Sequence, residues 1–302
     1  MRVFVTGATG FIGSAVVREL IDAGHHVVAL ARSDRAAAAV RATGAEVHRG
    51  ALEDLDSLRS GAAAADGVIH TAYIHDFSRM ESAARTDLRA IETLGAALEG
   101  SGRPLVITTG SALIKPGQVA TEDDAASPGA HLRLRAEDAA KDLAARGVRT
   151  SIVRPGASVH GEGDHGFVPV LIDIARTRGV SAYIGDGSNR WPAVHRLDAA
   201  RLYRLALEKA PAASVFHAVA ETGVPIRQIA EVIGRQLDVP VVSVAPEKAS
   251  EHFGWIGAFF ALDAPASSTQ TQERLGWRPT HRRLIADLEA GHYFTQAQPA
   301  AA

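Results

Sequence analysis

The sequence predicts an α/β fold in which a doubly wound parallel sheet precedes a smaller C-terminal α/β lobe. Over the first 155 residues, short apolar runs alternate with segments of helical spacing, and a glycine-rich turn follows the first run. After residue 155 the pattern loosens. The chain has 302 residues, 46% of them hydrophobic and 22% charged, which is enough for a packed core.

The expected strands of the sheet are the apolar runs of the first half. They are Val3–Val5, His26–Ala31, Glu46–His48, Gly67–Thr71, Pro104–Thr108 and Val148–Val153. Helical spacing separates them, as in Ile12, Val16 and Leu20. Strands joined through helices need crossover connections, so we expect a mostly parallel sheet with helices on both faces and ligands at the carboxyl ends of the strands.

The second half predicts fewer regular elements. Glycine and proline cluster in "RPGASVHGEGDHG" and "IGDGSNRWPAVHR". An α/β stretch follows, with a strand at Val215–Val219, a helix from Pro225 to about Leu237 and a strand at Pro240–Val244. Pro225 suits the first helical position, where its missing N–H costs nothing. We expect a first domain at residues 1–158, rejoined by segments around 192–219, a second lobe at 159–191 and 220–296, and a frayed tail at 297–302.

The stretch "VFVTGATGFIGSAVVREL" predicts a Rossmann-type dinucleotide site. Gly7, Gly10 and Gly13 follow a strand and open a helix. The first glycine permits a tight turn, the second lets the backbone approach a pyrophosphate, and the third permits close helix–strand packing. The free N–H groups at the helix start would bind the phosphates. The expected cofactor contacts of this loop include Thr9, Phe11 and Ile12. A purely structural glycine turn is the alternative.

The end of the second strand, "ALARSDR", bears on the choice of cofactor. An acidic residue here binds a free ribose 2′-OH, whereas an arginine accommodates a 2′-phosphate. Arg32 and Ser33 hold the position, with Arg35 close by, so we favour NADP(H). Asp34 keeps NAD(H) open, and Arg32 could instead begin a solvated helix.

Composition argues against several other classes of function. The net charge is −2 without a basic block, which disfavours nucleic acid and anionic membranes as partners. There are no cysteines, and no histidine spacing typical of a metal site occurs, so we expect no metal. The first residues enter a strand directly, and no apolar run reaches about 20 residues. We therefore expect a cytoplasmic protein with a small-molecule substrate.

Five motifs in order resemble the extended short-chain dehydrogenase/reductase superfamily, which contains NAD-dependent epimerases and dehydratases. They are "TGATGFIG", "GVIHTAY", "LVITTGSAL", "VRPGASVHGEG" and "GDGSNRWPAVHRLDAARL". The resemblance covers nearly the whole chain. It implies that Thr71 and Ala72 lie beside the cofactor and that Pro155 and Gly156 lie near the nicotinamide. Dimers are common in that superfamily, so the resemblance makes a homodimer one possible assembly and leaves the oligomeric state open.

The family's chemistry uses a Tyr-x-x-x-Lys pair on the helix after the fifth strand, and this sequence lacks it. The four tyrosines are Tyr73, Tyr183, Tyr203 and Tyr293. Aligning "RAEDAA" with the family's helix puts His131 at the tyrosine position and Arg135 at the lysine position. Lys141, six residues on from Arg135, would lie about 120° round the helix and cannot substitute.

Two groups are candidates for the missing acid. His131 could donate a proton near neutral pH, and Tyr73 follows the fourth strand at its carboxyl end. Tyr73 could instead contact the nicotinamide or line the pocket. Arg135 keeps the positive charge and could contact cofactor or substrate, but it cannot transfer protons. The alternative without a catalytic role is that "HLRLRAED" is only a solvated helix start.

The resemblance also suggests substrate contacts. Thr109 best matches the hydroxyl that orients the substrate oxygen, with Ser111 close behind. Segments that border the substrate in this family contain His160, Arg190 and Trp191. Arg190 could bind an anionic group, and Trp191 could stack on a ring or simply join the lobes.

Three functions remain open from the sequence. The first is an NADP(H)-dependent oxidoreductase acting on a small carbonyl or alcohol, with non-standard proton delivery. The second is a sugar-type epimerase or dehydratase, in which hydride is taken and returned. The third is a non-catalytic dinucleotide-binding redox sensor, which the missing Tyr–Lys pair favours.

Overall fold

A parallel sheet of seven strands forms the first part of the molecule. The computed structural model describes residues 1–76, 79–125 and 132–295. The strands of this sheet are β1 (Arg2–Thr6), β2 (His26–Ala31), β3 (Glu46–Arg49), β4 (Gly67–His70), β5 (Pro104–Thr108), β6 (Arg149–Pro155) and β10 (Ser214–Ala218). Their order is β10-β6-β5-β4-β1-β2-β3, and every neighbouring pair is parallel. The predicted doubly wound sheet is confirmed.

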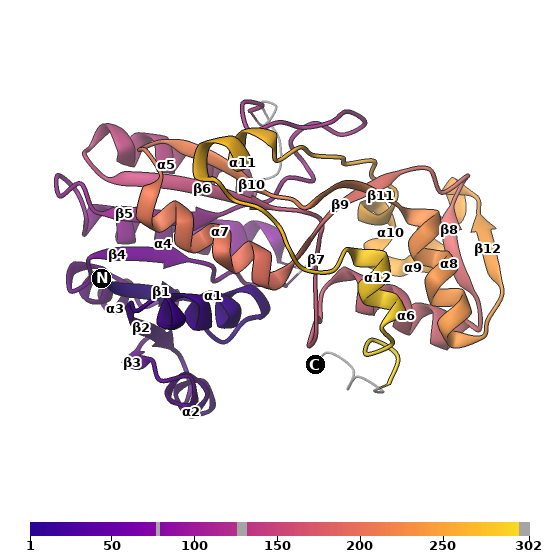
Figure 1. The fold of residues 1–302 in the computed structure, drawn as a ribbon, viewed down its shortest axis with the longest axis horizontal. Coiled ribbons are helices and arrows are strands. Elements are labelled where there is room, and N and C mark those ends of the chain that lie inside the picture. The colour runs from indigo at the N-terminus through magenta and orange to yellow at the C-terminus, as the bar shows by residue number, and fades with distance from the viewer. Residues whose placement is uncertain (77–78, 126–131, 296–302) are drawn as a thin grey trace.

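Helices cover both faces of this sheet (Figure 1). They are α1 (Phe11–Asp22), α2 (Asp34–Ala42), α3 (Leu55–Ala63), α4 (Met80–Ala96), α5 (Arg135–Ala145), α7 (Arg196–Lys209) and α11 (Thr269–Leu275). One core joins the sheet to α1 and α7, which pack side by side, and the other joins it to α3, α4 and α5. The strands are largely buried, as expected for a parallel sheet covered on both faces, except for the edge strand β3, which has no buried residue.

Local sequence explains where these helices begin. Val16 and Leu20 form the fully buried face of α1. Ser33 Oγ accepts a hydrogen bond from the Ala36 N–H at the start of α2, and Asp54 caps α3 through the Ser57 N–H. These caps fix how the chain leaves the carboxyl ends of β2 and β3.

A smaller lobe lies at the other end of the molecule (Figure 1). It contains the sheet of β7 (Ser158–His160), β9 (Arg190–His195) and β11 (Glu221–Pro225), and the parallel pair β8 (Ser181–Ile184) and β12 (Val241–Val244). Its helices are α6 (Phe167–Arg178), α8 (Ile226–Leu237), α9 (Ala249–Phe253), α10 (Gly257–Phe260) and α12 (Leu284–Glu289). Short 3-10 helices lie at η1 (Leu132–Leu134), η2 (Pro246–Lys248) and η3 (Gly254–Ile256). The predicted second α/β lobe is confirmed.

The structure departs from expectation at two points. Pro225 ends β11 and precedes α8, so its placement at the first helical position is wrong by one residue. The helix α6 was not expected, because Pro169 interrupts the pattern. The proline lies in the first turn, where a backbone N–H has no intrahelical acceptor, so no hydrogen bond of the helix is lost. Trp277 packs in the core shared with α7, and its indole N–H donates to the Asp198 carbonyl at 2.9 Å.

The expected domain limits stay a prediction. Among the described residues, no helix is long and apolar enough to cross a membrane.

Candidate cofactor and active site

The glycine turn between β1 and α1 is held against the end of β4. Gly7 has a φ of 73°, in the region that favours glycine, and a Cβ placed on it would lie 2.6 Å from the backbone N of Ala72. A Cβ on Gly13 would overlap the Gly7 carbonyl oxygen and crowd the Thr71 hydroxyl. Thr71 Oγ1 itself donates to the Thr6 carbonyl at 2.8 Å. Only glycine therefore fits at Gly7 and Gly13 without moving the backbone.

The N-terminus of α1 opens into the same region. Gly10 precedes the helix; within the described residues no side chain caps this end, and no acidic residue lies in its first turn. The helix start therefore keeps N–H groups and positive potential for an anion. The Phe11 ring lies between Arg196, whose guanidinium carbon is 5.1 Å from its centre, and the His165 ring at 5.7 Å. Two basic side chains thus flank the first residue of α1.

Exposed cations gather at the end of β2. Arg32 and Arg35 are both exposed. Asp34, the nearest carboxylate, forms an ion pair with Arg49 at the end of β3. The side chains of this ion pair are exposed, so Asp34, Arg32 and Arg35 all lie at the surface beyond the end of β2.

Tyr73 follows β4 at the same edge of the sheet. Its ring lies under Arg133, whose guanidinium carbon is 3.9 Å from the ring centre, and it meets the His75 ring edge-on at 5.2 Å. Burial raises the pKa of Tyr73, while the Arg133 cation opposes that shift and Asp87 adds to it. Burial, with Arg133 and His165 nearby, lowers the pKa of His75 to about 4.

A buried polar chain that sequence reasoning missed lies beneath this edge. Thr6 Oγ1 is 2.8 Å from His70 Nδ1, and His70 Nε2 is 3.0 Å from Asp87 Oδ1. All three residues are almost fully buried. These hydrogen-bonded side chains link the ends of β1 and β4 to α4. Their only signal in the sequence was one histidine ending an apolar strand.

Thr109 and Ser111 direct their hydroxyls into the protein. Thr109 Oγ1 donates to Glu137 Oε1 at 2.8 Å, and Ser111 Oγ donates to the Pro155 carbonyl at 3.1 Å. Both residues are buried. Their predicted contact with a substrate oxygen stays a prediction.

Glu137 is the centre of a second buried network that the sequence did not reveal. Arg154 Nε donates to Glu137 Oε1 at 2.8 Å, and Arg154 Nη2 donates to Glu137 Oε2 at 2.5 Å. The side chain of Glu137 is 3% exposed and that of Arg154 is 2% exposed, so this ion pair is buried on all sides. It fixes α5 against β6. Arg135, the residue predicted to contact cofactor or substrate, lies two residues earlier in the same helix.

The residues predicted to occupy the tyrosine and lysine positions differ in what the structure shows of them. Arg135 is the first residue of α5 and is exposed. His131 lies outside the described residues. Lys141 forms an exposed pair with Asp138, with 3.7 Å between Nζ and Oδ1.

Pro155 and Gly156 lie at the carboxyl end of β6, close to β9. A Cβ on Gly156 would lie 2.5 Å from the Pro192 carbonyl oxygen, so the two segments touch through their backbones. They share the edge of the sheet at which the glycine turn lies, as the predicted place near a nicotinamide requires.

The three predicted substrate residues are engaged within the chain. His160 is buried, with Nδ1 2.9 Å from Asp287 Oδ2. Arg190 donates twice to Asp263, at 3.0 and 2.8 Å. Trp191 has no exposed surface and packs on Phe167. Trp191 therefore lies within the core of the second lobe, and its predicted role at the substrate stays a prediction.

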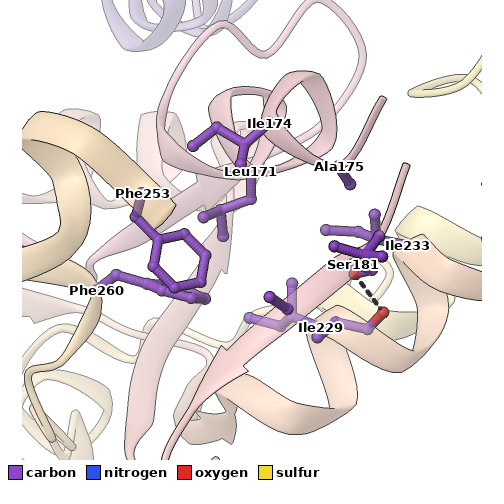
Figure 2. A pocket seen from close by; sticks show the side chains of 11 residues that line it. Leu171, Ile174, Ala175, Ser181, Ile229, Ile233, Phe253 and Phe260 are labelled. Carbon is purple, nitrogen blue, oxygen red and sulfur yellow. Dashed lines mark hydrogen bonds between the residues drawn. The ribbon is translucent and has the colours of Figure 1, made fainter. Parts of the chain in front are cut away.

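A small apolar cavity in the second lobe is separate from this site. Figure 2 shows Phe253 and Phe260 facing Leu171 and Ile229 across it. Ser181 Oγ donates to the Ala230 carbonyl at 2.8 Å on its wall. Its lining comes from α6, β8, α8, α9 and α10, and none of it from the glycine turn. It has room for about one water molecule and is a packing defect of the lobe core.

Comparisons with known proteins agree on one family. The model of the NAD dependent epimerase/dehydratase family matches residues 3–218. An uncharacterized protein of Schizosaccharomyces pombe is 52% identical over 97% of this chain and 100% of its own length. A 4-hydroxy-2-methyl-3-oxo-4-farnesyl-3,4-dihydroquinoline-1-oxide ketoreductase of Stigmatella aurantiaca is 27% identical over 84% of this chain and 80% of its own.

The solved structures show the same fold. A double mutant of dTDP-glucose 4,6-dehydratase from Streptomyces venezuelae, with NAD bound, superposes with a TM-score of 0.78. The alignment covers 97% of this chain and 96% of that one at 21% identity.

Proposed function

The chain belongs to the NAD dependent epimerase/dehydratase family, and on this premise we propose that it is an NADP(H)-dependent oxidoreductase acting on a small carbonyl or alcohol. The observation that carries the proposal is the uncapped N-terminus of α1 behind a glycine turn that no larger residue could form. When bound there, the nicotinamide cofactor would supply hydride to a carbonyl carbon or accept it from an alcohol.

The described residues fit a dinucleotide along the edge of the sheet. The backbone of Gly7, Gly10 and Gly13 and the start of α1 would hold the pyrophosphate, with Thr9, Phe11 and Ile12 around it. Arg32 and Ser33 would hold the 2′-phosphate. Thr71 and Ala72 would form the wall behind the cofactor, and Pro155 and Gly156 would border the nicotinamide. The ion pair of Asp34 with Arg49 supports NADP(H) over NAD(H), because this carboxylate, which follows the end of β2, already has a cationic partner.

The proposed substrate class, a small carbonyl or alcohol, rests on a similar protein and on the hydride transfer that a nicotinamide bound at this edge of the sheet would supply. The ketoreductase of Stigmatella aurantiaca is named for a carbonyl reduction, and its similarity spans most of this chain. A UDP-glucose 4-epimerase of Streptomyces lividans, 27% identical over 96% of this chain, supports the epimerase alternative. The two differ in cofactor use, since an epimerase returns its hydride and shows no bulk turnover of cofactor.

The function is tested by following the absorbance of NADPH with a panel of small aldehydes and ketones. We expect NADPH binding, followed by a carbonyl-dependent loss of the reduced-nicotinamide absorbance. Tight binding of NADPH without turnover on any carbonyl would count against the oxidoreductase and in favour of the redox sensor. A cofactor that copurifies and does not exchange would favour the epimerase.

The preference for NADP(H) predicts the effect of Arg32→Ala. We expect NADPH to bind about ten to a hundredfold more weakly, because a charge-assisted contact is worth about 1.5–3 kcal/mol. NADH affinity should stay unchanged, since NADH lacks the 2′-phosphate. Isothermal titration with both cofactors measures this, and Arg41→Ala, at the other end of α2, is the matched control. An equal loss for NADH and NADPH would contradict the assignment.

A further inference from the structure

The four tyrosines have very different surroundings. Tyr203 and Tyr293 are buried, and their hydroxyls form hydrogen bonds inside the protein. Tyr183 lies in β8 of the second lobe. Tyr73 alone among the four follows a strand of the seven-stranded sheet at the edge that carries the glycine turn. It is therefore the phenol that a ligand at this edge can reach.

The backbone before Tyr73 touches the glycine turn. A Cβ on Gly7 would lie within 2.8 Å of both N and Cα of Ala72, the residue immediately preceding Tyr73. Thr71, one residue earlier, is hydrogen-bonded to the Thr6 carbonyl. The Tyr73 side chain is half-buried and so borders both the interior and the crevice beyond the strand ends.

Arg133 supplies a cation to this phenol from another segment. It lies in η1, directly before α5, and its guanidinium carbon is 3.9 Å from the centre of the Tyr73 ring. A cation at this distance is attracted to the ring face and also stabilises negative charge on the phenolate oxygen. The chain thus has a tyrosine and a permanent cation side by side, although no Tyr-x-x-x-Lys segment exists in its sequence.

We infer that Tyr73 is the proton donor for the reduction and that Arg133 is the positioning residue that stabilises its phenolate. The inference rests on the proposed function. The carbonyl carbon gains a hydride from the reduced nicotinamide, and the carbonyl oxygen gains the proton of the Tyr73 hydroxyl. One C–H and one O–H bond form, the C–O double bond becomes single, and the cofactor is oxidised by two electrons. The phenolate then regains a proton from water.

The neighbouring groups favour Tyr73 over the other candidates. Desolvation, Arg133 and His165 lower the pKa of His75, which disfavours its charged, proton-donating form. Arg133 and Arg135 do not release protons. Burial and Asp87 raise the pKa of Tyr73, so the phenol is protonated at neutral pH, and the Arg133 cation opposes this shift. Arg133 therefore lowers the cost of giving up that proton.

The test compares Tyr73→Phe, Arg133→Lys and Arg133→Met in the full chain. We expect Tyr73→Phe to bind NADPH like the wild type and to lose about 10²–10⁴-fold in turnover, as for removal of a general acid. Arg133→Met should raise the pKa of Tyr73 by about 1 unit or more, whereas Arg133→Lys should largely preserve it. Ultraviolet titration of the tyrosinate without cofactor, as the wild-type curve minus that of Tyr73→Phe, measures the pKa. The alkaline limb of the rate profile should move in the same direction.

The controls come from the second lobe. Arg227 lies over the Tyr183 ring at 5.4 Å, so Tyr183→Phe and Arg227→Met repeat both changes away from the glycine turn. We expect neither to change turnover. Tyr73→Phe with turnover within a few-fold of the wild type, or Arg133→Met with an unchanged tyrosinate titration, would overturn the inference while leaving the oxidoreductase intact. A wild type that binds NADPH but reduces no carbonyl would overturn the proposed function itself, and with it the donor role of Tyr73.

Discussion

Replacing Glu137 by alanine is expected to lower the free energy of unfolding by about 3–5 kcal/mol, because it leaves the Arg154 guanidinium buried without its carboxylate. Arg154 is 2% exposed in its side chain and donates two hydrogen bonds to Glu137. The Thr109 hydroxyl would lose its acceptor as well. Urea denaturation followed by circular dichroism measures the loss.

Two further variants separate the buried charge from a general effect of substitution. Glu99→Ala removes the carboxylate of an exposed pair with Arg146, 3.4 Å apart, and should cost at most about 1 kcal/mol. The double variant Glu137→Met with Arg154→Met removes both charges and should be more stable than Glu137→Ala. If Glu137→Ala proved as mild as Glu99→Ala, the ion pair would not be the link that holds α5 to the sheet.

Replacing Gly7 by alanine is expected to weaken NADPH binding by at least about tenfold. It is also expected to lower the stability of the fold. The left-handed φ of 73° costs an alanine about 1–2 kcal/mol. In addition, its Cβ would push the backbone of Thr71 and Ala72 away from the turn, since Ala72 N lies 2.6 Å from the Cβ position. A displaced turn no longer presents the start of α1 to the pyrophosphate. Thermal unfolding with and without NADPH measures both effects.

Gly24 offers a matched control for this change. It has a φ of 83°, and a Cβ placed on it meets nothing within 4 Å. Gly24→Ala therefore carries the same backbone strain without the collision, and should lose stability while keeping its NADPH affinity. If Gly7→Ala and Gly24→Ala bound NADPH equally well, the glycine turn would be purely structural.

The first half of the fold was predictable because its strands, apart from the edge strand β3, are largely buried. A parallel strand covered on both faces is a continuous apolar run, as in Pro104–Thr108, and β2 and β5 have the predicted limits. In the second lobe, α6 was missed because Pro169 and the surrounding glycines disguise a buried face at Val168, Leu171 and Ile172. Sequence alone does not tell that a proline lies in a first turn.

The parts of the candidate site that the backbone forms were predictable from the sequence. The parts that side-chain contacts form were not. Gly7, Gly10 and Gly13 lie within one short stretch of the sequence, so their spacing can be read from it directly. The contact of Arg133 with Tyr73 and that of Arg154 with Glu137 join separate segments, and only the folded topology brings them together. Neither residue type nor spacing reveals which charged residue of α5 turns inward.

The order of the strands has a consequence for the protein's synthesis. The sheet takes its edge strand β10, and its covering helix α7, from residues beyond 190, and Trp277 completes the same core. A nascent chain that has emerged only to residue 158 leaves the apolar faces of β1 and α1 open to water. Such faces make partly made chains prone to association. This core can therefore close only after residues beyond 190 have left the ribosome, which prolongs the time for which these apolar faces are exposed during translation.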